Sequence, residues 1–180
     1  MLGFLKRRRL PADKRPKLGP DERVVAWAGA TGDNVVVATN HGLWLPGVEQ
    51  RLSWHEIHRA TWSGRQLAVV AARELPVGDE EYAVMADLPP LVLTLLDPDR
   101  VPDQVRVRVN KSIAHTSHHP LDEITGVRGG VRVVGRRVPG VNGLCWTVRY
   151  DEGVDPAATG VAEQTHELVA WARSSIGTAP

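Results

Sequence analysis

Short apolar segments separated by turn residues fill residues 23–96 and constrain the fold of this chain more than any other feature. The segments are rich in Val, Leu and Trp and end at clusters of Gly, Asn, Asp or Pro, which is the pattern of β-strands joined by tight turns. Strands this short, spaced by about 8–12 residues, predict an antiparallel sandwich or small barrel. We expect strands at residues 24–27, 35–39, 43–45, 51–54, 60–62, 66–72, 82–88 and 91–96.

Residues 101–114 fit two kinds of structure. Valines and arginines alternate over residues 105–109, as in a strand, whereas apolar residues recur at every fourth position from Val101 to Ile113, as in a helix. Pro102 suits the first turn of a helix. A helix over 101–114 is therefore the favoured prediction, with a strand as the alternative.

The last third of the chain predicts a hairpin and a helix. Residues 131–138 and 144–150 flank a Gly- and Pro-containing turn, which favours a hairpin. Asp155 and Pro156 suit the N-cap and first position of a helix, and the apolar residues that follow share one face. We expect an amphipathic helix over 155–176 that closes the open end of the β structure, so the fold class is α+β.

Three runs between residues 22 and 57 follow one another in a recognisable order. A strand at 22–27 precedes a Thr-x-x-Gly-Leu run from Thr39 to Leu43, and a Trp-x-x-Ile run follows from Trp54 to Ile57. Over about residues 20–75 this order resembles bacterial pleckstrin-homology-like (PH-like) domains, and the terminal helix matches the capping helix of that family. The resemblance implies a PH-like antiparallel β barrel or sandwich over 20–178, with the 101–114 helix and the hairpin as insertions. It also implies a binding scaffold rather than an enzyme, although a fold does not by itself fix a function.

The single cysteine and the hydropathy pattern indicate where the protein works. Cys145 has no partner for an intramolecular disulfide, and we interpret it as a buried strand residue in a reducing cytoplasm. No apolar run approaches the ~20 residues that a membrane-spanning helix needs. Residues 1–9 place their apolar side chains before their charges, which is the reverse of a secretory signal. We therefore expect a cytoplasmic protein.

Charge divides the chain at Gly19. Residues 1–19 carry seven basic side chains and one acidic side chain, whereas the other 161 residues carry 15 basic and 20 acidic side chains. Few apolar residues, together with Pro11, Pro16 and the directly following Pro20, predict that this basic tail is mobile in solution. It is a solvated extension, a contact for an anionic membrane or polyanion, or a segment that docks on the acidic body. The membrane interpretation rests on an apolar wedge beside a polybasic patch, formed by Leu2, Phe4, Leu5, Lys6, Arg7, Arg8 and Arg9.

A second group of basic residues lies between residues 124 and 150, where no acidic residue occurs. We call it the arginine island, and its candidate anion-binding members are Arg128, Arg132, Arg136 and Arg149. Period-two alternation places Arg132 and Arg136 on one strand face, where guanidinium groups suit phosphates or carboxylates. The alternative is that these arginines pair with acids elsewhere in the body.

The sequence offers no convincing catalytic or metal-binding motif. His55 and His58 lack the spacing of a helical zinc site, and His115, His118 and His119 lack an obvious completing ligand. The chain contains no Gly-x-Ser-x-Gly nucleophile elbow, and its glycine-rich stretch at 126–130 precedes a strand rather than a helix. We therefore expect no cofactor, no metal and no enzymatic activity.

The six tryptophans separate into core and surface candidates. We expect four of them to lie in the core, namely Trp27, Trp44, Trp54 and Trp62. Trp171 falls just off the apolar face of the expected terminal helix, so an exposed Trp171 is the best candidate for a protein contact.

Three functions follow from these features. The leading hypothesis is a non-enzymatic cytoplasmic binding module, peripheral to the inner surface of an anionic membrane through its basic tail. The first alternative is a protein–protein interaction adaptor with no lipid role. The second is a weak nucleic-acid binder, which is disfavoured because only Trp146 and Tyr150 accompany the arginines as stacking residues.

Overall fold

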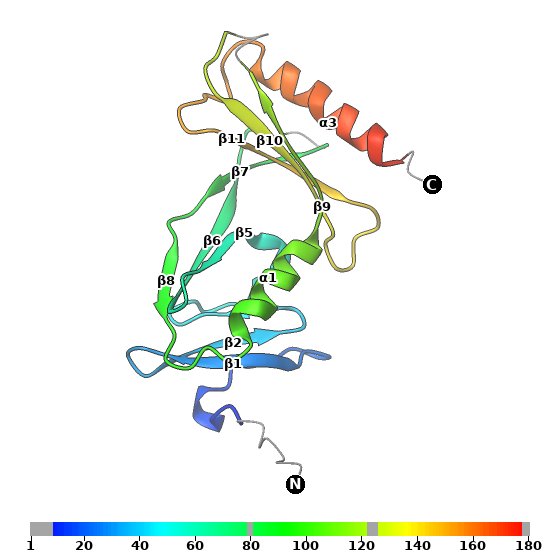
Figure 1. The fold of residues 1–180 in the computed structure, drawn as a ribbon. Coiled ribbons are helices and arrows are strands. Elements are labelled where there is room, and N and C mark those ends of the chain that lie inside the picture. The colour runs from blue at the N-terminus through cyan, green and yellow to red at the C-terminus, as the bar shows by residue number, and fades with distance from the viewer. Residues whose placement is uncertain (1–8, 79–80, 122–125, 178–180) are drawn as a thin grey trace.

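The computed structural model describes residues 9–78, 81–121 and 126–177, which form an α+β structure with two sheets (Figure 1). The first sheet has the order β1-β2-β3-β4, and the second has the order β5-β6-β7-β11-β10-β9, with β8 paired to β6. The strands are β1 (Val24–Ala30), β2 (Asn34–Thr39), β3 (Gly42–Trp44), β4 (Leu52–Ser53), β5 (Ile57–Trp62), β6 (Gln66–Leu75), β7 (Ala83–Asp87), β8 (Leu91–Thr94), β9 (Ile113–Pro120), β10 (Gly130–Arg136) and β11 (Cys145–Tyr150). The helices are the 3-10 turns η1 (Ala12–Lys14) and η2 (Trp54–Glu56) and the α-helices α1 (Val101–Ser112) and α3 (Val161–Gly177).

The N-terminal half curls into a half-barrel around one apolar core. Strand β8 pairs with β6 and reaches β1 through a bridge between Ala30 and Leu95. The Leu96 N–H donates to the Gly29 carbonyl at 2.9 Å beside this bridge. The two sheets therefore meet along β1 and β8, and the antiparallel curled arrangement agrees with the sequence prediction.

Helix α1 covers this first core. Val101, Val105 and Val109 are 0%, 1% and 5% exposed, and they pack into the same cluster as residues of β1, β2, β5 and β6. Their four-residue spacing is what places them on one helix face. The helical interpretation of this segment is therefore correct, although the helix ends at Ser112 rather than at residue 114.

Strand β9 starts directly at Ile113 and was not predicted. Ile113 has φ −90° and ψ 120°, which is extended backbone. The strand is rich in His, Ser and Thr, so it lacks the alternating apolar pattern from which strands are recognised. It is held by its pairing with β10, from Gly130 opposite Pro120 to Arg136 opposite Ile113.

A second apolar core lies between α3 and the sheet of β7, β9, β10 and β11. The predicted hairpin is confirmed, because β10 and β11 are antiparallel and in register from Val131–Tyr150 to Arg136–Cys145. Strand β7 joins them as a parallel neighbour of β11. Val131, Val133 and Val148 are almost fully buried under the helix residues Val169 and Ala172.

The role and start expected for the terminal helix are wrong. Helix α3 begins at Val161, not at residue 155, because Asp155 makes a local turn in which its carboxylate accepts from the Ala157 N–H at 2.9 Å. The helix packs on the second core rather than over the half-barrel, whose cover is α1 (Figure 1). The sequence does not reveal which helix faces which sheet, since both have one apolar face.

Three smaller expectations need adjustment. The strand predicted at 51–54 is reduced to Leu52–Ser53, because a capping box between Ser53 and Glu56 turns the chain into η2. Of the four tryptophans expected in the core, Trp54 is buried, whereas Trp27, Trp44 and Trp62 are half-buried. Cys145 lies in β11, as expected, but is half-buried.

No helix among the described residues is long and apolar enough to cross a membrane.

Candidate functional site

The described part of the basic tail lies against the first sheet. Residues 9–19 contain η1, and the Lys14 ammonium forms an ion pair with the Asp33 carboxylate and also donates to the Asp33 carbonyl at 3.0 Å. This portion of the tail therefore docks on the body, which was one of the three interpretations of the sequence. Arg9 is exposed. The remaining membrane candidates lie outside the described residues, namely Leu2, Phe4, Leu5, Lys6, Arg7 and Arg8.

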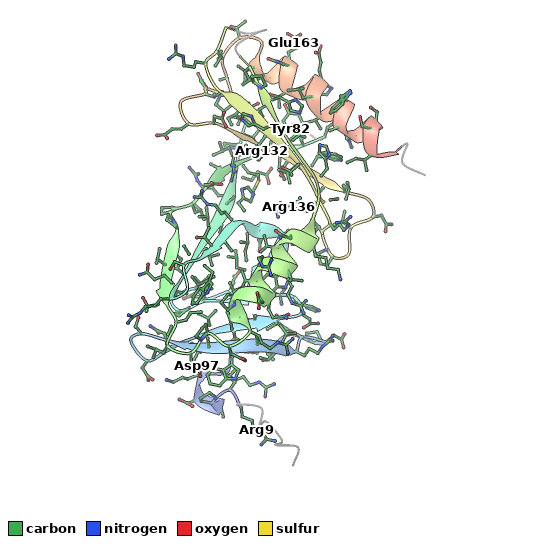
Figure 2. All side chains as sticks on the ribbon, viewed as in Figure 1. Arg9, Tyr82, Asp97, Arg132, Arg136 and Glu163 are labelled. Carbon is green, nitrogen blue, oxygen red and sulfur yellow. The ribbon has the colours of Figure 1, made fainter. Side chains whose placement is uncertain are left out.

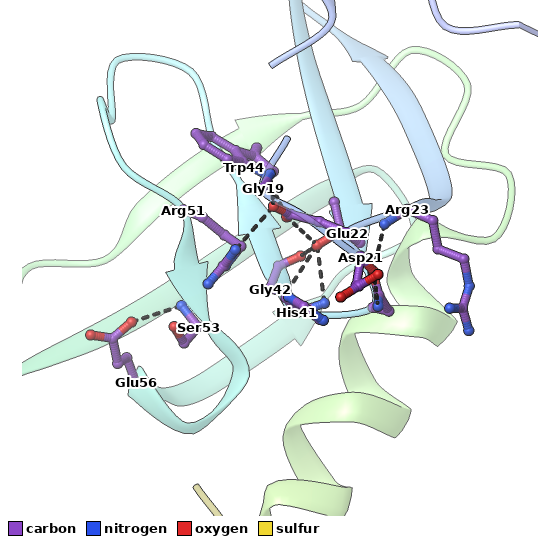
Figure 3. A network of polar contacts seen from close by, with 12 residues as sticks. Gly19, Asp21, Glu22, Arg23, His41, Gly42, Trp44, Arg51, Ser53 and Glu56 are labelled. Carbon is purple, nitrogen blue, oxygen red and sulfur yellow. Dashed lines mark hydrogen bonds and ion pairs between the residues drawn. The ribbon is translucent and has the colours of Figure 1, made fainter. Parts of the chain in front are cut away.

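A buried carboxylate anchors the other end of this segment (Figure 3). The side chain of Glu22 is fully buried. Its Oε1 accepts from the Thr39 hydroxyl at 2.7 Å and from the Trp44 indole N–H at 3.0 Å. Its Oε2 accepts from the Gly19 N–H at 2.9 Å and from the Arg51 guanidinium at 3.0 Å. Glu22 thus joins the N-terminal segment, β2, β3 and the loop before β4.

Hydrogen bonding outweighs burial in setting the charge of Glu22. Burial alone raises its pKa, but the hydrogen bonds from Gly19 and from two side chains, together with the Arg51 charge, lower the pKa from the ordinary 4.5 to about 2. The carboxylate is therefore ionised at neutral pH. Sequence reasoning missed this residue, because an acidic side chain just before a strand is normally solvated.

A cleft of about 590 Å³ opens beside this network. Its floor comes from β2 and β3, and its two sides come from the N-terminal segment and from the loop after β3. The lining residues are Lys14, Pro16, Lys17, Asp33, Asn34, Val35, Val37, Trp44, Leu45, Pro46, Val48 and Glu49. Val37 of β2 is only 1% exposed, although it does not belong to the first core. The face of β2 that points away from the first core is therefore also covered at this cleft.

The arginine island is divided by the strand register. Arg132 of β10 lies opposite Arg149 of β11 on one side and opposite His118 of β9 on the other. Because Val131 and Val133 point toward α3, these three residues occupy the opposite side of the sheet. We call this side, defined by Arg132, Arg149 and His118, the arginine face.

Acidic residues compensate the arginine face only in part. The Arg149 guanidinium donates to both oxygens of Asp87, at 2.9 and 3.0 Å, and His118 lies 2.9 Å from an oxygen of Asp151. Arg132 is half-buried, and its side chain makes no hydrogen bond or ion pair with another described residue. Arginines directly opposite each other repel, and neither aspartate contacts the Arg132 guanidinium, so Arg132 is the member of this face whose charge is not compensated by a direct contact.

Arg136 shares a strand face with Arg132, as the alternation predicted, but it does not belong to the accessible surface. It is 4% exposed, and its Nη1 donates to the Ser112 hydroxyl at 3.1 Å at the end of α1. Arg137 donates to the carbonyls of Lys111 and Ile113 at 3.2 Å each. Both arginines thus stabilise the negative end of the α1 dipole. Burial and the Arg149 charge lower the pKa of Arg136.

Two candidate basic surfaces lie at different ends of the molecule. Arg9 lies at the end that carries the first sheet, whereas Arg132 lies in the half that carries α3 (Figure 2). Arg128, the remaining island residue, is exposed in the loop before β10 and has no partner among the described residues. The tail and the arginine face therefore need separate tests.

Several histidine rings make polar contacts with nearby side chains. His58 Nδ1 lies 3.1 Å from Asp87, and burial together with Arg136 lowers the His58 pKa below its ordinary range despite this contact. His115 and His119 each place Nε2 within 3.0 Å of the Ser117 hydroxyl. Within residues 9–78, 81–121 and 126–177, no group of three or more metal-ligating side chains comes together.

Trp171 lies on α3 and is 57% exposed. Its ring forms a T-shaped contact with the His119 ring, at a centroid distance of 6.2 Å and an interplanar angle of 84°. Trp171 is therefore exposed, which was the condition set by the sequence analysis, and its role in a protein contact stays a prediction.

Comparisons with known proteins assign neither a family nor a function. No family model matches the chain, and no curated protein or solved structure does so. The α+β class rests on the structure itself, and the resemblance to PH-like domains stays a prediction.

Proposed function

We propose that the protein is a non-enzymatic binding module that associates with anionic membrane lipids, with the arginine face as its headgroup site. The main support for this proposal is the position of Arg132. It lies between Arg149 and His118, and its side chain has no acidic partner among the described residues. A phosphate group would relieve the repulsion between the two arginines, because each guanidinium offers a planar fork of donors. This function places the protein in the cytoplasm, at the inner membrane surface.

The basic N-terminal segment supports the same proposal from the other end of the chain. Residues 1–19 have a net charge of +6, and a basic residue near an anionic surface contributes about 1 kcal/mol of attraction. Lys14 is engaged by Asp33, so Lys6, Arg7, Arg8 and Arg9 are the residues to test. Deleting the whole tail would also remove the Gly19 N–H from Glu22, which makes neutral substitutions the cleaner change.

Vesicle co-sedimentation tests the proposal. Full-length protein should bind phosphatidylglycerol-containing vesicles at low salt and not phosphatidylcholine vesicles. Arg132→Gln should weaken binding about five-fold, and replacing Lys6, Arg7, Arg8 and Arg9 together by Gln should weaken it more strongly and remove most of its salt dependence. Arg106→Gln is the matched control, because Arg106 is an exposed helix arginine with only an i,i+3 partner. Absence of binding, or equal binding to neutral vesicles, would refute a lipid role.

A protein-interaction adaptor is the second candidate, and the exposed Trp171 favours it. It predicts protein complexes that persist at high salt and that Trp171→Ala weakens, with no binding to vesicles.

A single-stranded oligonucleotide added to the vesicle assay tests the third hypothesis, a nucleic-acid binder. Such a protein would dissociate from the vesicles to bind the oligonucleotide, and its affinity for the oligonucleotide would fall as the salt concentration rises.

A further inference from the structure

We propose that the cleft beside Trp44 binds a small amphipathic molecule that stacks a flat ring on the indole and presents one acidic group to Lys17. The cleft is independent of the arginine face, since it is built from the N-terminal segment, β2, β3 and the loop after β3. Its volume of about 590 Å³ falls in the range of small-molecule sites, which is about 300–1,000 Å³.

The Trp44 ring is fixed before any ligand arrives. Its indole N–H donates to Glu22 at 3.0 Å, and Glu22 is held in turn by Thr39 and Arg51 (Figure 3). Trp44 is also paired in register with Val37, which lines the floor. A ring that is already oriented loses little freedom when a ligand stacks on it, and such preorganisation favours affinity.

One side of the cleft is a strap, which we define as residues 14–19. The strap is tied down at both ends, by the Lys14–Asp33 ion pair and by the Gly19 N–H on Glu22. Pro16 lies between these anchors and lines the cleft. Proline has a fixed φ, so the wall between the two anchors is stiff.

The other side is the loop that contains Pro46 and Val48. Val48 lines the cleft and is 42% exposed, so it leaves apolar surface open to a ligand. Together with the floor residues Val35 and Trp44, these side chains make the body of the cleft apolar. An apolar ring is the ligand group that such a surface favours.

The charges on the rim select a ligand with a single acidic group. Lys17 is exposed and has no partner among the described residues, whereas the nearby Lys14 is already paired with Asp33. Glu49, also exposed and without a described partner, lines the same cleft. Glu49 repels an acid, so the acidic group of the ligand belongs beside Lys17.

Fluorescence titration with 1-anilinonaphthalene-8-sulfonate tests the site, since this probe has an aromatic body and one sulfonate. We expect saturable binding with one probe per protein. Val48→Trp, which fills the cleft from a loop, should weaken binding at least ten-fold, and Lys17→Glu should weaken it about five-fold. Glu49→Gln should tighten binding two- to three-fold.

Matched variants separate this site from others. Val141→Trp adds the same side chain at another loop valine, 49% exposed, and should leave binding unchanged. Arg132→Gln should also leave it unchanged, which separates the cleft from the proposed lipid site. Equal thermal midpoints for Val48→Trp and wild type show that folding is intact. Binding that Val48→Trp and Lys17→Glu leave unaltered, or that Arg132→Gln abolishes, would overturn the proposal.

Discussion

Arg136 of β10 reaches the last residue of α1 and donates to the Ser112 hydroxyl at 3.1 Å, joining a helix of the first core to a strand of the second. The Ser112 hydroxyl in turn donates to the Val109 carbonyl at 2.7 Å. Arg136 Nε is buried without a partner among the described residues. This guanidinium therefore depends on the serine and on the helix end.

Removing the acceptor should harm the protein more than removing the arginine. Ser112→Ala leaves a buried charged donor unpaired, and we expect it to lower the free energy of unfolding by about 1–3 kcal/mol. Arg136→Met removes the charge and retains apolar volume, so its loss should be smaller. Urea unfolding at pH 7 measures both, with Arg106→Met as a surface control. A Ser112→Ala protein as stable as wild type would contradict this prediction.

Glu22 should make the protein sensitive to acid. Its folded pKa of about 2 lies below the ordinary 4.5, so its contribution to stability is fully present above about pH 4.5 and disappears as pH falls toward 2. The shift corresponds to about 3 kcal/mol. Glu22→Gln should lower stability at pH 7 and flatten this part of the stability–pH curve. Denaturant unfolding between pH 7 and pH 2.5 would show whether the two curves converge, and parallel curves would exclude the proposed role.

Two strand glycines should respond differently to alanine. A Cβ on Gly42 would lie 2.4 Å from the Leu52 carbonyl oxygen, which is backbone of the paired strand β4, whereas a Cβ on Gly29 meets nothing within 4 Å. We expect Gly42→Ala to destabilise the protein by about 1–3 kcal/mol. Gly29→Ala should leave stability the same or slightly higher. Thermal unfolding of both variants distinguishes the two environments. Equal midpoints would contradict the prediction, because they would show that β4 moves away from the added Cβ at no measurable cost in stability.

His119 should report on Trp171 as pH changes. Burial and the neighbouring His118 and His115 lower the pKa of His119 below 6.5. Because the pKa of His119 is lower in the folded state than in the unfolded state, protonation of this ring favours the unfolded state. The free energy of unfolding of the wild type should therefore decrease as the pH falls below 6.5, and that of His119→Gln should decrease less. Because the rings are in contact, tryptophan fluorescence should change over the same range. The fluorescence change should vanish in Trp171→Phe; if it persists there, another tryptophan is responsible.

Local patterns predicted the elements, and non-local packing decided the rest. The valine spacing in α1 and the alternation in β10 are visible along the chain, and both elements formed where expected. Strand β9 was not predicted because its polar residues show no strand periodicity. Its extended conformation is stabilised by pairing with β10. The sequence also did not show which helix covers which core, since the apolar face of a helix does not indicate the sheet on which it packs.

The candidate sites show the same division. Alternation correctly predicted that Arg132 and Arg136 share a strand face, but it gave no sign that Arg136 would be buried beside the end of α1. The exposure of Trp171 could be expected because its position on the helix follows from the helical period, whereas its role in a protein contact stays a prediction. Glu22 and the cleft depend on contacts between residues up to 29 positions apart, for which the sequence carries no local signal.

Strand β6 has a consequence for how the molecule comes apart. Its first part pairs with β5 and β8, and its last four residues, from Ala72 to Leu75, pair with β7 in the sheet of the second core. One continuous backbone therefore belongs to both halves, so opening either half breaks hydrogen bonds of the same strand. We expect amide protons along β6 to exchange only through global unfolding, and the two halves to melt in one cooperative transition rather than one after the other.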